Sequence, residues 1–156
     1  MGGPTKYYDY STKNMKHIFS IFYKLLKKKD FQLVVIPSMR TPLNTIHYAK
    51  EFFGENHTGI MDVDKKAYLS ALAISENIIV TCDSSSMISE AALTGKPIYI
   101  ANILPKKNDI RFQRFRNLFR DLNITRNLGE DVENWTYQSL DETIRVAKII
   151  KEKINY

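Results

Sequence analysis

Residues 83–97 read DSSSMISEAALTGKP, and this stretch decides the fold because it joins two apolar runs. The run before it, residues 77–82 (NIIVTC), and the run after it, residues 98–102 (IYIAN), each have the length and composition of a buried strand. The polar start of the stretch predicts a loop and its middle predicts a short helix. Gly95 would end that helix, and Pro97 prevents its continuation. The expected order is therefore strand, loop, helix, strand.

The same stretch indicates an anion-binding loop. In an open α/β sheet, ligands bind in the crevice at the carboxyl ends of the strands, and a helix that begins there offers unpaired N–H groups and a positive dipole end. Ser84, Ser85 and Ser86 place small hydroxyl side chains at that point, and any of them can cap the helix. Spacing leaves two interpretations of Glu90, as a member of a capping box or as an acceptor for ribose hydroxyls. The anion that fits best is a phosphate.

Helical and strand-like segments alternate along the rest of the chain. Residues 31–36 and 57–61 have strand character and raise the number of expected strands to four. Apolar spacing predicts a helix capped by Ser11 or Thr12, and further helices through residues 46–53, 67–74, 111–122 and 140–154. This alternation predicts an α/β fold with a Rossmann-like, doubly wound parallel sheet, forming one domain over residues 1–156.

A glycine turn at the amino end, Gly2-Gly3-Pro4, has no strand in front of it. In doubly wound sheets the glycine turn that faces a phosphate follows the first, central strand, but only Met1 precedes this one. We therefore expect a sheet whose first strand is missing. An unpaired strand edge favours self-association, or stabilisation by an amino-terminal half that is encoded separately.

Composition restricts the class of protein. With 156 residues and 44% hydrophobic content, the chain can form one ordinary core. The single cysteine, Cys82, lies in an apolar strand pattern and is interpreted as a small buried residue rather than a reactive thiol. No apolar run approaches the length of a membrane-spanning helix, which needs about 20 residues. We expect a soluble, cytoplasmic protein, with peripheral attachment to a membrane left open.

The net charge of +6 is spread over several segments. It gives weak attraction to anionic surfaces, but no nucleic-acid-binding module accompanies it, so we expect no nucleic-acid partner. His17, His47 and His57 lack metal-ligand spacing, and we predict surface or packing roles for them and no metal site. Asp83 is interpreted as a residue that orients the serine loop or forms a turn.

Several blocks of the chain resemble the mitochondrial-fission family called elongated mitochondria. They are GGP at residues 2–4, SMRTP at 38–42, AYLSALAISENIIVTCDSSSMISEAALTGKPIYI at 67–100, WTY at 135–137 and LDET at 140–143. The blocks occur in the family's order, but they resemble only the carboxyl half of a family member. Family members look like GT-B glycosyltransferases, and bacterial members carry a label as nucleoside-diphosphate-sugar epimerases. The resemblance thus implies the carboxyl-terminal domain of a GT-B-like fold.

The resemblance also implies roles for single residues. In GT-B enzymes the donor's diphosphate lies on a helix amino terminus and an acidic residue binds the ribose, which favours Glu90 as the ribose ligand. Arg40 matches the family's SxRTP motif and is expected to grip phosphate through its planar fork, although a surface arginine without specific contacts is the alternative. The diphosphate-binding residues implied in this way are Ser84, Ser85, Ser86, Met87, Arg40, Ser38, Gly2 and Gly3.

The expected function is binding of a nucleotide sugar, or of its nucleoside diphosphate, by a GT-B-like domain. Sugar transfer needs an acceptor and a base from a second domain, so we expect this chain to be inactive alone, and no cofactor is expected beyond the nucleotide-sugar ligand. An adaptor of the mitochondrial-fission type and a fragment without function are the alternatives.

Overall fold

The computed structural model describes residues 1–28, 31–54, 58–59 and 63–154. Helices and strands alternate along these residues, as the sequence predicts. In chain order they are α1 (Thr12–Lys28), β1 (Val34–Val35), α2 (Leu43–Phe53), β2 (Thr58–Gly59), α3 (Lys65–Ile74), β3 (Ile78–Thr81), α4 (Ser85–Ala92), β4 (Ile98–Ala101), α5 (Ile110–Asp121), β5 (Thr125–Asn127) and α6 (Glu142–Ile154).

The strands form two parallel groups. β1 pairs with β2, and β3, β4 and β5 pair in that order. β5 was not predicted, because its three residues, TRN, are too few and too polar to give a strand pattern. β1 is shorter than the predicted strand, and of the strand predicted at residues 57–61 only Thr58–Gly59 lies within the described residues.

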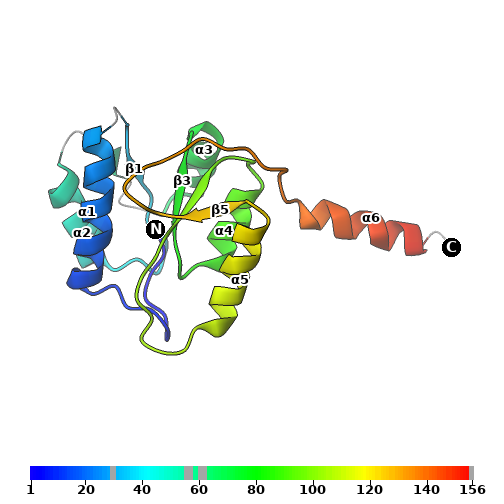
Figure 1. Ribbon diagram of the computed structural model, residues 1–156, viewed down its shortest axis with the longest axis horizontal. Helices are drawn as coiled ribbons and strands as arrows, with labels where there is room; N and C mark the ends of the chain where they lie inside the picture. Colours follow the sequence, from blue (N-terminus) through cyan, green and yellow to red (C-terminus); the bar gives the residue numbers. More distant parts are fainter. Residues whose placement is uncertain (29–30, 55–57, 60–62, 155–156) are drawn as a thin grey trace.

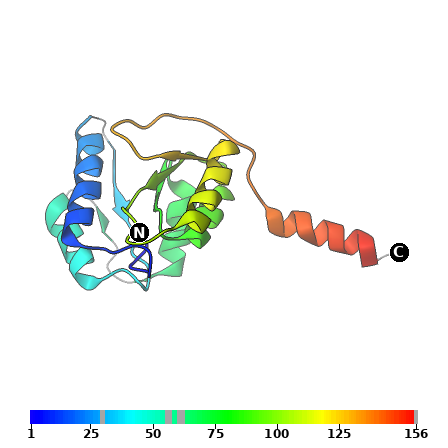
Figure 2. The same ribbon diagram turned by 60° about the horizontal axis from the view of Figure 1, so that its bottom comes forward.

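The helices flank the strands. α1 packs against α2, whereas α4 contacts β3 and β4, and α5 contacts β5. Figures 1 and 2 show α1 and α2 together on one side of the molecule, with α4 and α5 on the other side. β4 is buried along its whole length, and Ile88 of α4 packs in the same core as Ile98 and Ile100. The arrangement is a mixed α/β fold of Rossmann-like type, which confirms the predicted class.

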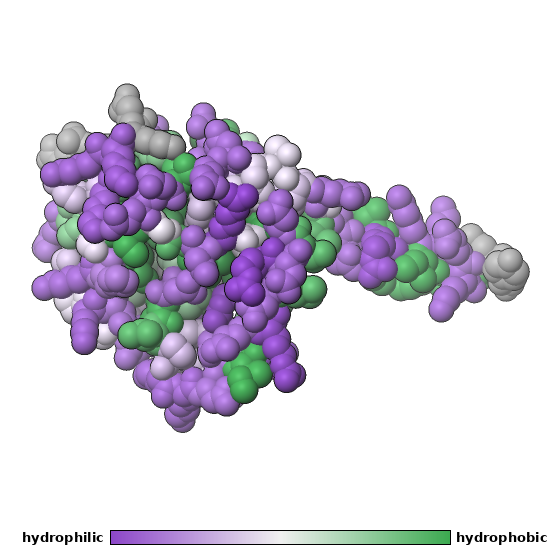
Figure 3. Space-filling view, viewed as in Figure 1, coloured by the Kyte–Doolittle hydropathy of each residue, from purple (hydrophilic) through white to green (hydrophobic). Residues whose placement is uncertain are grey.

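The last helix projects away from this body. α6 extends from the rest of the chain in both ribbon views, and none of its residues is buried (Figure 1). The sequence predicts an apolar face at Ile144, Ala147 and Ile150, but Ile144 and Ile150 are 54% and 50% exposed. Figure 3 shows green apolar patches beside purple polar ones along this helix. The apolar face is therefore present but uncovered.

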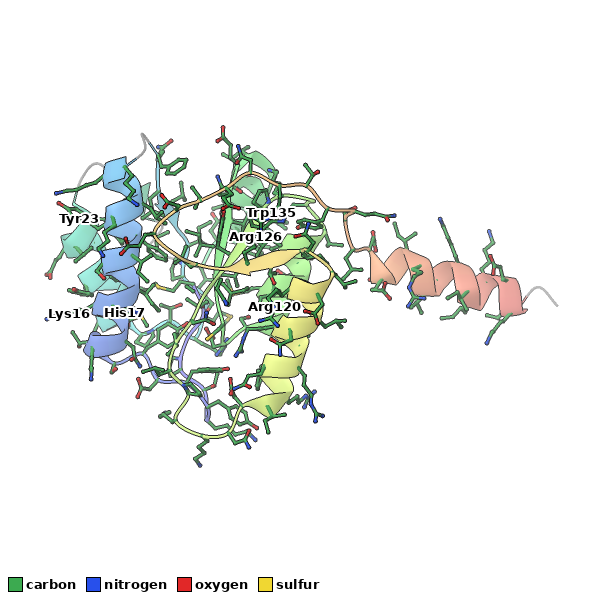
Figure 4. The ribbon with its side chains drawn as sticks, in the orientation of Figure 1. Lys16, His17, Tyr23, Arg120, Arg126 and Trp135 are labelled. Atoms are coloured by element: carbon green, nitrogen blue, oxygen red, sulfur yellow. The ribbon has the colours of Figure 1, made fainter. Side chains whose placement is uncertain are left out.

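The segment before α6 is fixed to the body by Trp135. Its indole ring meets the ring of Tyr99 edge-on, with 5.1 Å between centroids, and its Nε1 donates to the carbonyl oxygen of Asn123 at 3.0 Å. The guanidinium of Arg126 in β5 lies over the same ring, 4.3 Å from its centroid, and the two labelled side chains are close together in Figure 4. The chain thus crosses β4 and β5 before α6 begins.

Candidate functional site

The serine loop leads into α4 as predicted. Ser84 is the N-cap, with extended backbone, and its hydroxyl accepts from the N–H of Met87. Ser84 is buried, Ser86 is exposed, and Met87 packs partly against the core. Because the cap is Ser84, the third helical position is Met87 and not an acidic residue. The capping-box interpretation of Glu90 is therefore wrong.

A hollow of about 640 Å³ opens beside the first turns of α4 and α5. It is lined by Ser85, Ser86, Ser89, Glu90, Arg111, Phe112 and Phe115. α4 and α5 follow the neighbouring parallel strands β3 and β4, and the two helices lie side by side in Figures 1 and 2. The hollow is thus at the carboxyl ends of parallel strands, where ligands bind in open α/β sheets.

Glu90 is held in place by a tyrosine from α3. The Tyr68 hydroxyl donates to Oε2 of Glu90 at 2.7 Å. Burial and the hydrogen bond to Glu90 raise the pKa of Tyr68 above its ordinary value, so the phenol stays protonated and keeps donating. The Glu90 side chain itself is exposed and retains further acceptor capacity, as an ionised carboxylate has about four lone-pair sites.

Asp83, which directly precedes the N-cap Ser84, is the common acceptor in a second group of polar contacts. Its carboxylate accepts from the Gly3 N–H at 3.1 Å, from the Tyr10 hydroxyl at 2.6 Å and from Nη2 of Arg40 at 3.0 Å. Its side chain is fully buried, whereas that of Arg40 is 43% exposed. Burial and the proximity of Asp83 raise the pKa of Tyr10, which keeps this phenol a donor as well. Asp83 therefore does orient the start of the serine loop.

Arg40 is held in place by hydrogen bonds to Asp83 and to the amino-terminal segment. Besides the Asp83 contact, its Nη1 donates to the carbonyl oxygen of Gly3 at 3.0 Å. The interpretation of Arg40 as a surface arginine without specific contacts is therefore wrong. A guanidinium carries five N–H donors, so these contacts leave donors for an anion. Contact of Arg40 with a diphosphate stays a prediction.

Gly2 and Gly3 are required by close packing at the same place. A Cβ on Gly2 would lie 2.2 Å from a carboxylate oxygen of Asp83, and one on Gly3 would lie 2.1 Å from the carbonyl oxygen of Arg40. Ser38 belongs to the same loop, since its hydroxyl accepts from the Arg40 N–H at 3.3 Å. Most predicted site residues thus form two groups, one around the hollow and one around Asp83, whereas Ser84 and Met87 do not line the hollow.

Some residues of the hollow were missed by sequence reasoning. The residue patterns assigned no site role to Arg111, Phe112 or Phe115, which also line the hollow. Phe119 is the buried member of the predicted apolar face of α5, whereas Leu118 is 55% exposed. The available signal was topological: α5 follows β4 as α4 follows β3, so its first turn had to lie near the serine loop.

The remaining candidates for chemistry are structural. Asp109 is buried and accepts from Tyr8, Arg116 and Gln113. Cys82 is buried and burial raises the pKa of its thiol, which fits a packing residue. His17 and His47 are exposed, as predicted, and His57 lies outside the described residues. In the described part of the chain, no group of three or more histidine, cysteine or acidic residues is placed to hold a metal ion.

The fold and the position of the hollow define a Rossmann-like α/β protein with a candidate ligand site at the carboxyl ends of β3 and β4. The model of the family described as "Mitochondrial fission ELM1" matches residues 1–154, so the chain belongs to the mitochondrial fission ELM1 family. This confirms the family resemblance found in the sequence. No solved structure matches the chain.

Two curated proteins are similar to this chain. An uncharacterized protein of Rickettsia prowazekii, RP120, is 30% identical over 162 aligned residues, which cover 97% of this chain and 44% of that protein. The mitochondrial fission protein ELM1 of Arabidopsis thaliana is 34% identical over 90 residues, covering 56% of this chain and 21% of that protein. The chain thus spans less than half the length of these relatives. No helix among the described residues is long and apolar enough to cross a membrane.

Proposed function

We propose that this chain is a nucleotide-sugar-binding domain that holds the nucleoside diphosphate in the hollow between α4 and α5. One observation carries the proposal: hydroxyl groups from the first turn of α4, the carboxylate of Glu90 and the guanidinium of Arg111 all line one hollow. The hydroxyl groups and the guanidinium can donate to a diphosphate, and the carboxylate can accept from the hydroxyl groups of a ribose.

Each part of the ligand has a candidate partner in the hollow. The diphosphate is assigned to the first turn of α4, where Ser85 and Ser86 lie at the positive end of the helix dipole. The ribose is assigned to Glu90, because Tyr68 fixes its carboxylate. Arg111, from α5, provides a positive charge for the phosphates. The rings of Phe112 and Phe115 provide apolar surface for the base.

The hollow has the size of ligand pockets, which span about 300 to 1,000 Å³. Among the described residues it is lined by α4 and α5 alone. Half of a cleft covers only part of the ligand, so we expect a Kd near the millimolar range, equivalent to about −4 kcal/mol. Transfer of the sugar would need an acceptor and a base from outside this hollow.

Titration with uridine diphosphate, followed by NMR, tests the proposal. We expect amide shifts at residues 85–90 and at Arg111. Arg111→Gln should weaken binding about tenfold, because one charge-assisted contact of about 1.4 kcal/mol is lost. Arg114→Gln is the matched control: it removes the same charge from an exposed position on the same helix, outside the hollow. Equal weakening by both variants, or no shifts in wild type at millimolar ligand, would reject the proposal.

A further inference from the structure

The two strand groups leave β3 with one unpaired edge among the described residues. Ile78 N–H donates to the carbonyl of Pro97, and Cys82 N–H donates to that of Ala101, so these residues direct their backbone toward β4. Backbone groups of alternate residues point to opposite edges of a strand. The N–H and C=O groups of Ile79 and Thr81 therefore point away from β4.

Met1 already forms one rung of a parallel ladder beside the end of β1. Its amino group donates to the carbonyl oxygen of Ile36 at 2.7 Å, and Ser38 N–H donates to the carbonyl oxygen of Met1 at 3.0 Å. Bonding to the residues on either side of the opposite position is the pattern of parallel strands. By alternation, Val34 turns its backbone groups to the same edge as Ile36.

The same amino-terminal segment also touches the end of β3. The N–H of Gly2 donates to Oγ1 of Thr81 at 2.8 Å, in addition to the contact between Gly3 and Asp83. Figures 1 and 2 both place the amino terminus between β1 and β3. The edge of β1 at Val34 and Ile36, and the edge of β3 at Ile79 and Thr81, are called the acceptor edges below. A strand that ran in front of Met1 in the same direction as β1 and β3 would lie beside both edges.

We propose that the acceptor edges bind one parallel β-strand from a segment outside residues 1–156, which ends beside Met1 and joins the two strand groups into one sheet. The resulting order, β2, β1, added strand, β3, β4, β5, places the added strand at the centre, where a doubly wound sheet has its first strand. The glycine turn at Gly2 and Gly3 would then follow that strand directly.

The chemistry of the occupant follows from its surroundings. Helices lie on both sides of the strands, and strands buried on both faces are near-continuous apolar runs rich in Val and Ile. The apolar side chain of Val34, which is 41% exposed, offers surface for such a strand to cover. The expected occupant is an apolar segment of about 5 residues.

The length of the relatives indicates where such a strand can come from. The Rickettsia relative shares 97% of this chain, yet more than half of its own length lies outside the match. Proteins of this family therefore contain further chain that can supply a strand. An exposed strand edge recruits an added strand through main-chain hydrogen bonds, which is a common mode of peptide recognition.

Amide hydrogen exchange with a synthetic peptide, Lys-Lys-Val-Ile-Val-Ile-Thr, tests the proposal in the absence of any nucleotide. Exchange at Ile36 and Ile79 should slow about tenfold relative to Val80, which already belongs to the ladder with β4, and the melting temperature should rise with peptide concentration. The control peptide Lys-Lys-Val-Pro-Val-Pro-Thr should do neither, because proline cannot donate to a ladder.

A fused version removes the dependence on peptide affinity. The same apolar segment is attached ahead of Met1, which raises its effective concentration. Because burial lowers the pKa of the Met1 ammonium to about 6, the N-acetylated chain serves as the control for loss of that charge. Unchanged exchange at Ile36 and Ile79 in the fused chain would overturn the proposal. So would slow exchange at both amides in the unfused monomer, or a dimer in which a second copy protects them.

Discussion

At the residue scale, Asp83 joins three segments of the chain through one buried carboxylate. The sequence indicated that Asp83 orients the serine loop or forms a turn, because aspartate is common in turns. Its partners were not predictable, since Arg40, Tyr10 and Gly3 lie 43, 73 and 80 residues away along the chain. Local patterns carry no information on contacts of that range. The GGP and SxRTP blocks were predicted to bind phosphate, which stays a prediction; in the structure their residues contact Asp83 at the start of the loop before α4.

Replacement of Gly3 tests whether these contacts brace the loop. In Gly3→Ala, the new Cβ would lie 2.1 Å from the Arg40 carbonyl oxygen, so the backbone must shift and the Asp83 contact weakens. We expect a loss of about 2 kcal/mol in the free energy of unfolding, measured by urea titration. Gly129→Ala is the control, because nothing lies within 4 Å of its Cβ position, and should change stability by less than about 0.5 kcal/mol. Equal stability of the two variants would contradict the bracing role.

At the element scale, the β3–α4–β4 unit was predicted correctly because each of its signals is local. The strands have apolar runs, Ser84 caps the helix, and Gly95 has the positive φ of 71° that favours glycine after a helix. The contribution of α5 was missed, because an amphipathic pattern shows that a face is apolar but not what it contacts. Phe119 of that face is buried, whereas Phe112 and Phe115 line the hollow.

The uncovered face of α6 leads to a prediction about this helix. Deletion of residues 142–156 should change the free energy of unfolding by less than about 0.5 kcal/mol, because no residue of α6 is buried. Deletion from residue 134 onward is the comparison: it also removes Trp135, which packs on Tyr99 and bonds to Asn123, and should cost about 3 kcal/mol. Both are measured by thermal and urea unfolding. A large loss in the shorter deletion would show that α6 packs on the body in solution.

At the scale of the whole molecule, buried polar contacts connect parts of the chain that strand pairing does not connect. The sequence predicted the α/β class from its alternation of elements, but not the division of the strands into two groups, which depends on pairing between segments far apart. Tyr8 provides one such tie. Its hydroxyl donates to Asp109, and Arg116 donates to both Tyr8 and Asp109, so the amino-terminal segment is fixed to the start of α5.

The carboxylate of Asp109 makes this tie dependent on pH. Burial raises its pKa, but hydrogen bonds from Tyr8, Arg116 and Gln113 outweigh burial and hold the pKa below its ordinary value of 3.8. The folded state therefore favours the ionised form. Its contribution to stability is fully present above about pH 4 and is lost as the pH falls through the lower pKa of the folded state. We expect the tie to weaken only under acid conditions.

Asp109→Asn tests both the tie and its pH dependence. At pH 7 the variant should lose about 3 kcal/mol of unfolding free energy, because Arg116, only 16% exposed, keeps its charge without a counter-charge. At pH 3 the difference from wild type should shrink, since part of the wild-type carboxylate is then protonated. Asp121→Asn is the control: its pair with Arg120 is long, at 3.8 Å, and exposed, so its loss should be negligible at either pH. A difference between Asp109→Asn and wild type that stays constant from pH 7 to pH 3 would show that the carboxyl group acts through its shape and not through its charge.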